Sequence, residues 1–544
     1  MSTRNIESAW EYHIATKHSW QSVRSDAHRL DFENYPLPFK VYPTLEPLAL
    51  PREGQQSGMV ALSVMADPCA EPASDVVPEV ATLAQVLFFC AGVTKVRKFP
   101  GGEIFFRAAA CTGALYEIEL YVVCGELPGL AAGVYHFNAG DFALRRLRSG
   151  DFRGALVRAA ADEPAVQHAP MILVSTGTYW RNAWKYQART YRHFGWDNGT
   201  LHANLLAMCS AWRLPARVVC GFADDEVNRL LDLDTMREVA LTLVPLGHGA
   251  AAPPELAEIA RLGLEVIPPS KREVDYPAMR AMHQASSLAP DEVAAWRTGA
   301  RTECSAALQG GRAGLSGLQA PVESTGLRTP EKPGATITAK RVALEALAED
   351  ALPRDTIEQV ILRRGSARRF ARESITFAQL ATILDRATRG IPADFLGSAG
   401  APLNELYLLA NAVEGLAPGA YYFACVRREL ECLKEGNFRE QASYLGLEQE
   451  LPGDAAACVF FLADLKRVLE RYGSRGYRAV QLEAGILGGK LYLGAYAQGL
   501  GATGLTFYDD DVVEFFSPHA EGKSAIFLVA IGHPARRTLV PPPA

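Results

Sequence analysis

Runs of apolar residues divide the chain into short strands and longer helices. Apolar positions at helical spacing predict one helix over 78–92 and a long one over 189–214. Short apolar runs at 119–123, 171–175 and 239–244 predict buried strands. Helices and strands mixed in this order predict an α+β fold.

Two stretches lack this regular pattern. Residues 1–50 are polar and aromatic, and prolines such as Pro36 and Pro38 predict an extended arm that lies on the body. Residues 251–345 are rich in Gly, Ala, Ser and Pro and are too long for a simple loop. We expect this segment to connect two domains, with short helices near 254–262 and 291–301.

The pattern of the first half returns in the second half after a shift of 286 residues. Gly133, Tyr135 and Phe137 fall on Gly419, Tyr421 and Phe423. The shift holds for Tyr186, Arg189 and Arg192, which fall on Tyr472, Arg475 and Arg478. A constant offset over this length predicts two tandem copies of one α+β domain. The predicted division is an arm at 1–50, a first copy at 51–250, a linker at 251–345 and a second copy at 346–544.

Composition and charge narrow the function classes. The 544 residues are 49% hydrophobic and carry a formal charge of −6, which argues against a nucleic-acid partner. No apolar run is long enough to span a bilayer, and the first residues lack the apolar core of a signal peptide. Ten scattered cysteines without a C-x-x-C pair predict reduced thiols in a cytoplasmic protein. The histidines lack metal-ligand spacing, so we expect no metal site.

A cationic stretch, residues 364–370, is the strongest candidate for chemistry. Arg364, Ser366, Arg368 and Arg369 fall within six residues, which suits a phosphate held by guanidinium groups. We expect this stretch at the start of a helix, whose N–H groups would add to the site. The alternative is a solvated basic patch.

The comparison of the two copies favours an anion site. The counterpart of the cationic stretch in the first copy, residues 78–84, contains no Lys or Arg. The glycine-rich turn 499–504 falls on 213–218, which contains no glycine, and Arg536-Arg537 fall among alanines. Because three features are missing together, one anionic ligand held by the second copy explains the pattern better than a basic patch.

The motifs resemble a known family. Arg364-x-Ser366-x-Arg368-x-Phe370 and the turn at 499–510 are similar to motifs of the nitroreductase superfamily of FMN proteins. Residues 107–117 resemble the R-A-x-P-S-A-G-A-L-Y-P motif of its SagB/ThcOx-type dehydrogenase branch. This chain has Ala110-Cys111 in place of Pro-Ser, and Glu117 in place of the last proline.

The resemblance implies a cofactor and its ligands. Members of the family are usually homodimers with two FMN sites between the subunits, so the two copies here should form an internal pseudo-dimer. The chain itself remains a monomer or a homodimer of such chains. The implied phosphate ligands are Arg364, Ser366, Arg368 and Arg537, and the implied ring contacts are Gly504, Leu505, Thr506, Ala110, Cys111, Thr112 and Ala114. Since the first copy lacks the cations, we expect one FMN per chain.

A Lys-Tyr pair suggests the reaction. In azoline-oxidising relatives such a pair abstracts a proton, and Lys185-Tyr186 resembles it, whereas the second copy has Arg471-Tyr472. Arginine is a poor base, so Lys185 is the better candidate, with surface ion pairing as the alternative. We expect an FMN-dependent oxidoreductase that dehydrogenates a heterocyclic or peptide-derived substrate. The alternatives are an NAD(P)H-dependent nitro or quinone reductase and a non-catalytic flavin-bearing scaffold in a peptide-modification complex.

Overall fold

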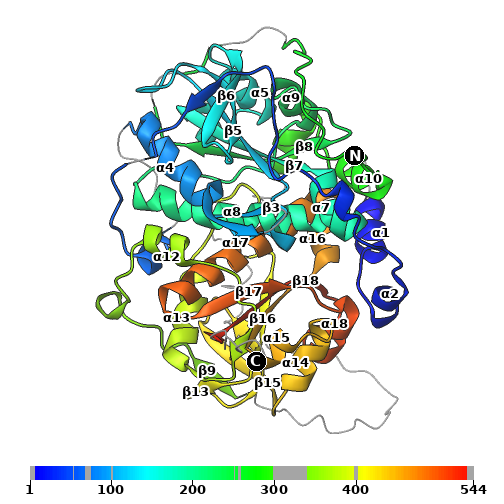
Figure 1. Ribbon diagram of the computed structural model, residues 1–544. Coiled ribbons are helices and arrows are strands. Elements are labelled where there is room, and N and C mark those ends of the chain that lie inside the picture. Colours follow the sequence, from blue (N-terminus) through cyan, green and yellow to red (C-terminus); the bar gives the residue numbers. More distant parts are fainter. Residues whose placement is uncertain are drawn as a thin grey trace, which may run out of the picture.

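The computed structural model describes residues 6–52, 54–67, 75–99, 102–249, 252–254, 259–297, 340–396 and 402–535. Two α+β halves are stacked on each other, and the long helices α8 (Thr190–Ala211) and α17 (Arg475–Ala497) lie between them (Figure 1). Among these residues, no helix has the length and apolar character needed to cross a membrane.

The first half is built on a six-stranded sheet in the order β1-β6-β5-β4-β7-β8. Its strands are β1 (Pro47–Ala49), β4 (Ile118–Cys124), β5 (Gly133–Asn138), β6 (Ala143–Ser149), β7 (Met171–Thr178) and β8 (Glu238–Leu246). The strands β2 (Val93–Phe99) and β3 (Gly102–Arg107) form a separate two-stranded ribbon. The helices are α3 (Ala61–Val64), α4 (Val80–Ala91), α5 (Arg153–Ala159), α6 (Pro164–Gln167), α7 (Tyr179–Tyr186), α8 and α9 (Asp224–Leu230).

The second half repeats this plan. Its main sheet runs β10-β18-β16-β12-β14-β15-β9, and β17 also pairs with β18. Its strands are β9 (Arg341–Ala343), β10 (Phe370–Ala371), β12 (Glu405–Ala410), β14 (Gly419–Ala424), β15 (Glu429–Glu435), β16 (Ala457–Ala463), β17 (Gly501–Leu505) and β18 (Ser524–Pro534), while β11 (Ile375–Thr376) and β13 (Val413–Glu414) pair separately. The helices are α12 (Ile357–Arg363), α13 (Phe377–Ala387), α14 (Arg439–Leu445), α15 (Glu450–Asp454), α16 (Leu465–Tyr472), α17 and α18 (Asp509–Phe516).

The repeat and the α+β class are confirmed. Strands β5 and β14 begin at Gly133 and Gly419, and helices α7 and α16 end at Tyr186 and Tyr472, each pair 286 residues apart. The predicted helix at 78–92 is α4, and the predicted strands at 119–123, 171–175 and 239–244 are β4, β7 and β8. The fold is therefore two tandem domains that form an internal pseudo-dimer.

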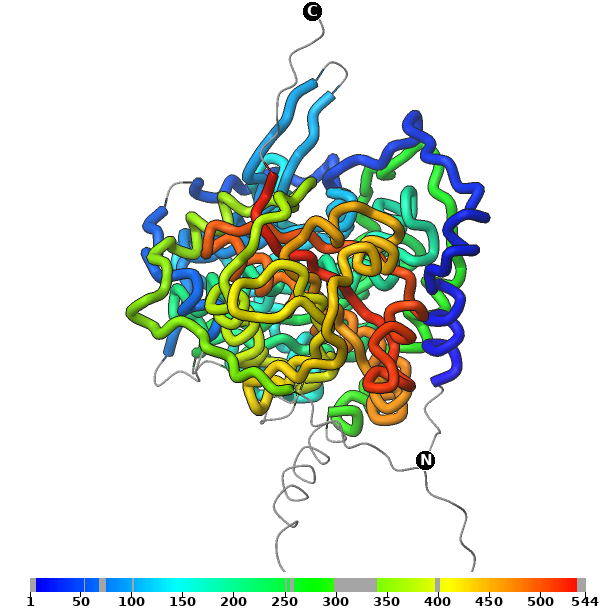
Figure 2. The backbone as a smooth tube through the Cα atoms, turned by 90° about the horizontal axis from the view of Figure 1, so that it is seen from below, coloured from blue at the N-terminus to red at the C-terminus, as the bar shows by residue number. Residues whose placement is uncertain are grey.

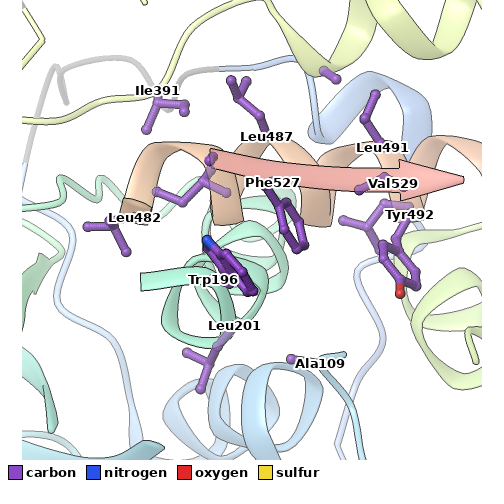
Figure 3. Close-up of a cluster of buried hydrophobic side chains, with 14 of the residues drawn as sticks. Ala109, Trp196, Leu201, Ile391, Leu482, Leu487, Leu491, Tyr492, Phe527 and Val529 are labelled. Carbon is purple, nitrogen blue, oxygen red and sulfur yellow. The ribbon is translucent and has the colours of Figure 1, made fainter. Parts of the chain in front are cut away.

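Helices α8 and α17 cross at a pair of equivalent glycines. A Cβ added at Gly199 would lie 2.5 Å from the Cα of Gly485, so both positions must lack a side chain for this close approach. Beside the crossing, Trp196 Nε1 donates to Gln481 Oε1 at 2.7 Å, and the Trp196 ring packs against Phe527 (Figure 3). The two halves therefore share one apolar core.

The arm and the linker differ from the sequence predictions. The arm contains two helices, α1 (Glu7–Ala15) and α2 (Trp20–Ser25), instead of being extended throughout. The linker contains α10 (Pro277–Ala285), which was not predicted although Pro277 occupies a favourable first position. Residues 291–297 are helical, as predicted for the start of 291–301. The predicted helix at 254–262 falls partly outside the described residues, and residues 259–262 are not helical.

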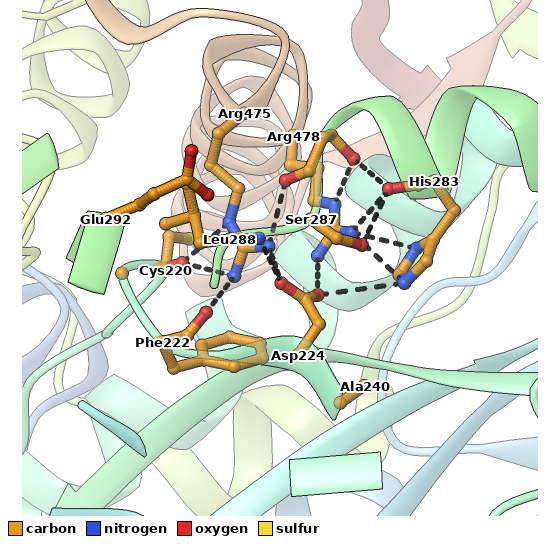
Figure 4. Close-up of polar contacts among 12 residues, drawn as sticks. Cys220, Phe222, Asp224, Ala240, His283, Ser287, Leu288, Glu292, Arg475 and Arg478 are labelled. Carbon is orange, nitrogen blue, oxygen red and sulfur yellow. Dashed lines mark hydrogen bonds and ion pairs between the residues drawn. The ribbon is translucent and has the colours of Figure 1, made fainter. Parts of the chain in front are cut away.

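The arm helix α1 and the linker helix α10 occupy equivalent places. In each half an aspartate binds two arginines of the other half: Asp224 lies 2.6 Å from Arg475 and 2.7 Å from Arg478 (Figure 4). The equivalent carboxylate, Asp509, lies 2.6 Å from Arg192. The carbonyl oxygen of His283 in α10 accepts from Arg478, as that of His13 in α1 accepts from Arg192. Helix α10 of the linker therefore plays the same structural part for the second copy as the arm helix α1 does for the first.

Candidate functional site

The cationic stretch follows a helix instead of starting one. Helix α12 begins after Thr356, which forms a capping box with Gln359, and ends at Arg363. Residues 364–369 then run without regular structure to the short strand β10. The predicted contribution from a helix N-terminus is therefore wrong, and any attraction of this stretch for an anion cannot come from such a helix start.

Arg364 joins the stretch to the first copy. Its Nε donates to the carbonyl oxygen of Ala108 at 2.9 Å, and its Nη2 donates to that of Arg107 at 3.0 Å. Both carbonyls belong to the start of the loop 107–117, which the sequence placed opposite the cationic stretch. The structure thus brings these two motifs together across the pseudo-dimer.

Ser366 and the predicted ring loop meet at a tyrosine that sequence reasoning missed. The hydroxyl of Tyr492 lies 3.3 Å from Ser366 Oγ and accepts from the backbone N–H of Gly504 at 2.5 Å. Gly504 and Leu505 lie in β17, and Thr506 follows directly. Tyr492 belongs to the interior of α17, where an aromatic residue at helical spacing gives no signal beyond core packing.

Lys185 and Tyr186 are the last two residues of α7, and their side chains lie close together. Burial lowers the pKa of Lys185, and the neighbouring Arg368 guanidinium lowers this pKa further. The Lys185 ammonium lies 5.1 Å from the centre of the Tyr186 ring. A Cβ added at Gly113 would lie 2.8 Å from the Tyr186 hydroxyl, so the Lys-Tyr pair of the first copy adjoins the loop 107–117, whose first two carbonyls accept from Arg364 of the second copy.

The loop 107–117 carries the two departures from the family motif, and they are in contact. The Cys111 thiol lies 3.4 Å from Glu117 Oε2 and 3.3 Å from Asp197 Oδ2. Burial, followed by these two carboxyl groups, raises the pKa of Cys111, so the thiol remains protonated. Asp197 accepts from the N–H and from the hydroxyl of Thr112, each at 2.9 Å.

The remaining members of the predicted ring contact line the same loop. The carbonyl of Ala110 accepts from Thr200 Oγ1 at 2.6 Å, and Ala114 has a positive φ of 56°. Arg537 lies outside the described residues, so its predicted contact has no structural counterpart here. Cys111, Glu117 and Asp197 also form the group of possible metal ligands found among the described residues, with ligand atoms within 4.8 Å of one another.

The residues present fit a phosphorylated ring compound. Arg368 and Lys185 are cations that interact electrostatically, since Arg368 adds to the effect of burial in lowering the pKa of Lys185, and neither has an acidic partner within ion-pair distance among the described residues. Two unpaired cations repel each other and attract a dianion such as a phosphate group. The Thr506 hydroxyl is buried without a hydrogen-bond partner, which leaves a polar group for a ligand to satisfy.

The equivalent position in the other half is filled. Trp296 of the linker is 1% exposed, and its Nε1 donates to the carbonyl oxygen of Tyr472 at 3.0 Å. A Cβ added at Gly221 would lie 2.9 Å from the Trp296 ring. Tyr472 is the counterpart of Tyr186. Gly221 corresponds to Thr506, by the same one-residue slip that makes Asp224 equivalent to Asp509, so the indole lies where the second flavin-like site would be expected.

Polar groups around this indole are also paired internally. Arg297 lies 2.9 Å from Glu163, and Glu163 also pairs with Arg217 at 3.3 Å. Asp394 accepts from the N–H groups of Cys220 and Gly221 at 2.9 and 2.8 Å. The cation Arg217 is therefore committed to a protein carboxylate, in contrast to Arg368.

Residues 361–533 match the sequence profile of the Nitroreductase family. The chain is 28% identical over 166 residues to "Putative nitroreductase MJ1384" of Methanocaldococcus jannaschii, a match over 30% of this chain and 79% of that protein. It is also 28% identical over 160 residues to the trifolitoxin-processing protein TfxB of Rhizobium leguminosarum bv. trifolii, over 28% of this chain and 43% of TfxB.

The crystal structure of a "putative nitroreductase" from Anabaena variabilis has the same overall fold. It superposes with a TM-score of 0.72 and 24% identity, and the match covers 97% of this chain and 99% of that one. The tandem arrangement of two α+β copies is therefore shared over the whole length.

Proposed function

We propose that this chain, whose residues 361–533 form a nitroreductase-family domain, is an FMN-dependent oxidoreductase that dehydrogenates a heterocyclic or peptide-derived substrate, as in azoline-to-azole oxidation. The family domain supports a flavin oxidoreductase. The relative TfxB is named for processing trifolitoxin, and this favours a role in maturing a biosynthetic product over general nitro-group reduction.

One observation carries the proposal: the cationic stretch of the second copy and the Lys-Tyr pair of the first copy border the same loop, 107–117, which Arg364 holds at its first two carbonyls and Tyr186 approaches at Gly113. Burial, and after it Arg368, lowers the pKa of Lys185, and neither cation has an acidic partner within ion-pair distance among the described residues. Arg364 and Arg368 would hold the FMN phosphate, and Gly504, Leu505 and Thr506 would lie along the ring. The bound flavin would supply a two-electron acceptor at this site.

Residues of the first copy would accept the proton that the substrate loses. Dehydrogenation of a C–H bond next to a heteroatom removes a hydride and a proton, and the proton needs a base. Burial and Arg368 lower the pKa of Lys185, which increases its neutral fraction near neutral pH. Burial raises the pKa of Tyr186 instead, so its phenol remains protonated and serves to orient the substrate.

The first experiment is a visible absorption spectrum of the gently purified protein. We expect the two bands of oxidised flavin and azole formation from a thiazoline-containing peptide with O2 as acceptor. Steady NADPH oxidation with nitrofurazone, without azole formation, would favour the reductase instead. Turnover with neither substrate, together with a stable complex in a pull-down, would favour the scaffold. A colourless protein that does not take up added FMN would contradict all three.

We also propose one flavin per chain. The position equivalent to the proposed site is filled by Trp296, and the nearby cation Arg217 pairs with Glu163 at 3.3 Å. Flavin released by acid precipitation and divided by the protein concentration tests this stoichiometry. A ratio near two after dialysis would contradict the proposal.

A further inference from the structure

The two-stranded ribbon of β2 and β3 extends beyond the rest of the described chain (Figure 2). No third strand pairs with either of its edges among the described residues. Isolated two-stranded ribbons are only marginally stable in water, and open edges accept further strands. The outer edges of β2 and β3 are therefore available for pairing with a further strand.

Side chains on one face of the ribbon make contacts within the protein. Phe105 packs against Phe39 of the arm with ring centres 5.1 Å apart. Lys98 pairs across the ribbon with Glu103 at 3.1 Å. Val96, opposite Phe105 in the register, has 43% of its surface exposed.

The other face of the ribbon carries two cations and two exposed apolar side chains. Lys95 and Arg97 of β2 project from it and have no acidic partner among the described residues. Phe99 and Ile104, which share this face, are 46% and 40% exposed. A face with two unpaired cations and exposed apolar groups complements a partner with acidic and apolar groups.

We propose that the open edge of β2 binds an extended peptide in which acidic and apolar residues alternate. A strand added beside β2 would place every second residue next to Lys95 and Arg97. The intervening residues would lie on the opposite face, next to Val96. Because cationic and apolar side chains alternate along β2, acidic and apolar side chains should alternate along the bound peptide.

The ribbon leads to the proposed active site, and in this respect the inference rests on the proposed function. Strand β3 ends at Arg107, whose carbonyl accepts from Arg364 at 3.0 Å. Helix α13 is the structural counterpart of α4, which precedes the ribbon, and the described residues after α13, 388–396 and 402–404, form no such ribbon. The ribbon therefore leads to the side of Lys185 and Tyr186, where a peptide bound to β2 would present a nearby residue for reaction.

The test uses fluorescence anisotropy with the full chain and a labelled peptide of about eight residues that alternates Glu and Val. We expect salt-sensitive binding that Lys95→Glu/Arg97→Glu weakens about tenfold or more. The matched control, Lys98→Glu/Glu103→Lys, exchanges a pair on the opposite face and should leave binding unchanged. A peptide with Lys in place of Glu should not bind.

Several outcomes would overturn the inference. Equal binding of the Lys and Glu peptides would do so, as would unchanged affinity in Lys95→Glu/Arg97→Glu. Concentration-dependent dimers that this variant abolishes, in a protein that binds no peptide, would identify the ribbon as a contact between two chains. Flavin content and thermal stability of the variant should match those of the parent, so a failure here is distinguishable from a failure of the proposed function.

Discussion

Arg364 of the second copy holds the carbonyl oxygen of Ala108 in the first copy at 2.9 Å from its Nε. Arg364→Ala would remove a charged donor from two carbonyl groups and a cation from the proposed phosphate site. Hydrogen bonds to charged groups contribute about 1.5–3 kcal/mol, so we expect FMN affinity to fall by about tenfold or more. Quenching of FMN fluorescence on titration measures this change.

Arg369→Ala is the matched control for that variant. Arg369 is exposed and belongs to the same stretch, but among the residues that the structure describes no side-chain hydrogen bond or ion pair ties it to the first copy. If Arg369→Ala lowers FMN affinity as much as Arg364→Ala does, the contact with Ala108 has no special role.

Arg368 should set the pH dependence of the reaction. If neutral Lys185 is the base, the rate rises with pH through the pKa of Lys185. Burial and Arg368 both lower this pKa, so Arg368→Gln should raise it and shift the acidic limb of the rate profile to higher pH. The profile is measured at saturating FMN, because Arg368 is also a proposed phosphate ligand. An unshifted limb, or an unchanged rate in Lys185→Ala, would exclude Lys185 as the base.

Replacing Trp296 separates packing from cofactor binding. Trp296→Ala empties a buried position, and such a change costs about 3–5 kcal/mol of unfolding free energy. Chemical denaturation should show this loss. The flavin content should stay near one per chain, because emptying the position supplies no phosphate ligand. A gain to two flavins would show that the indole alone closes the second position.

The crossed aspartates should be essential for stability. Burial alone would raise the pKa of Asp224, but Arg475 and Arg478 outweigh this effect and lower the pKa to about 2. Asp224→Asn would leave both arginines without their carboxylate and should cost about 3–5 kcal/mol of unfolding free energy. The exposed neighbour offers a control, Asp225→Asn, with little expected change. Thermal unfolding of both variants compares them directly.

Glu483 should make stability depend on pH. Burial raises the pKa of its carboxyl group from 4.5 to about 7 in the folded protein. Its contribution is therefore complete below pH 4.5 and is lost as pH rises through 7, by at most about 3 kcal/mol. Denaturant midpoints across this pH window should fall in the parent and stay flatter in Glu483→Gln. Parallel curves for the two proteins would contradict this assignment.

Much of the fold could be read from the sequence because its cores are strongly patterned. The apolar run at 171–175 and the helical spacing around Leu201 and Leu205 each became the element predicted. The helix start at Thr356 carried a readable signal as well, since Gln359 completes its capping box. This cap starts the helix at Thr356, so the cationic stretch follows the helix end at Arg363 and does not lie at the predicted helix start.

The 286-residue repeat does not include the arm of the second copy. Helix α10 lies only 270 residues after α1, not 286, because the linker and the first arm differ in length. Between them, His13 and His283 are identical, but Tyr12 is replaced by Met282. The role of Trp296 depends on a contact with Tyr472, far away in the chain, and no local pattern predicts such a contact.

The filled position around Trp296 has a consequence for how such a protein can change. In a symmetric homodimer every substitution appears on both sides, so an indole that closes one site would close the other as well. A single chain that carries both copies is free of this constraint. One copy can lose ligand binding and serve as structural support. The other copy can keep its cations and its open ribbon, and its site can become specific for a single substrate.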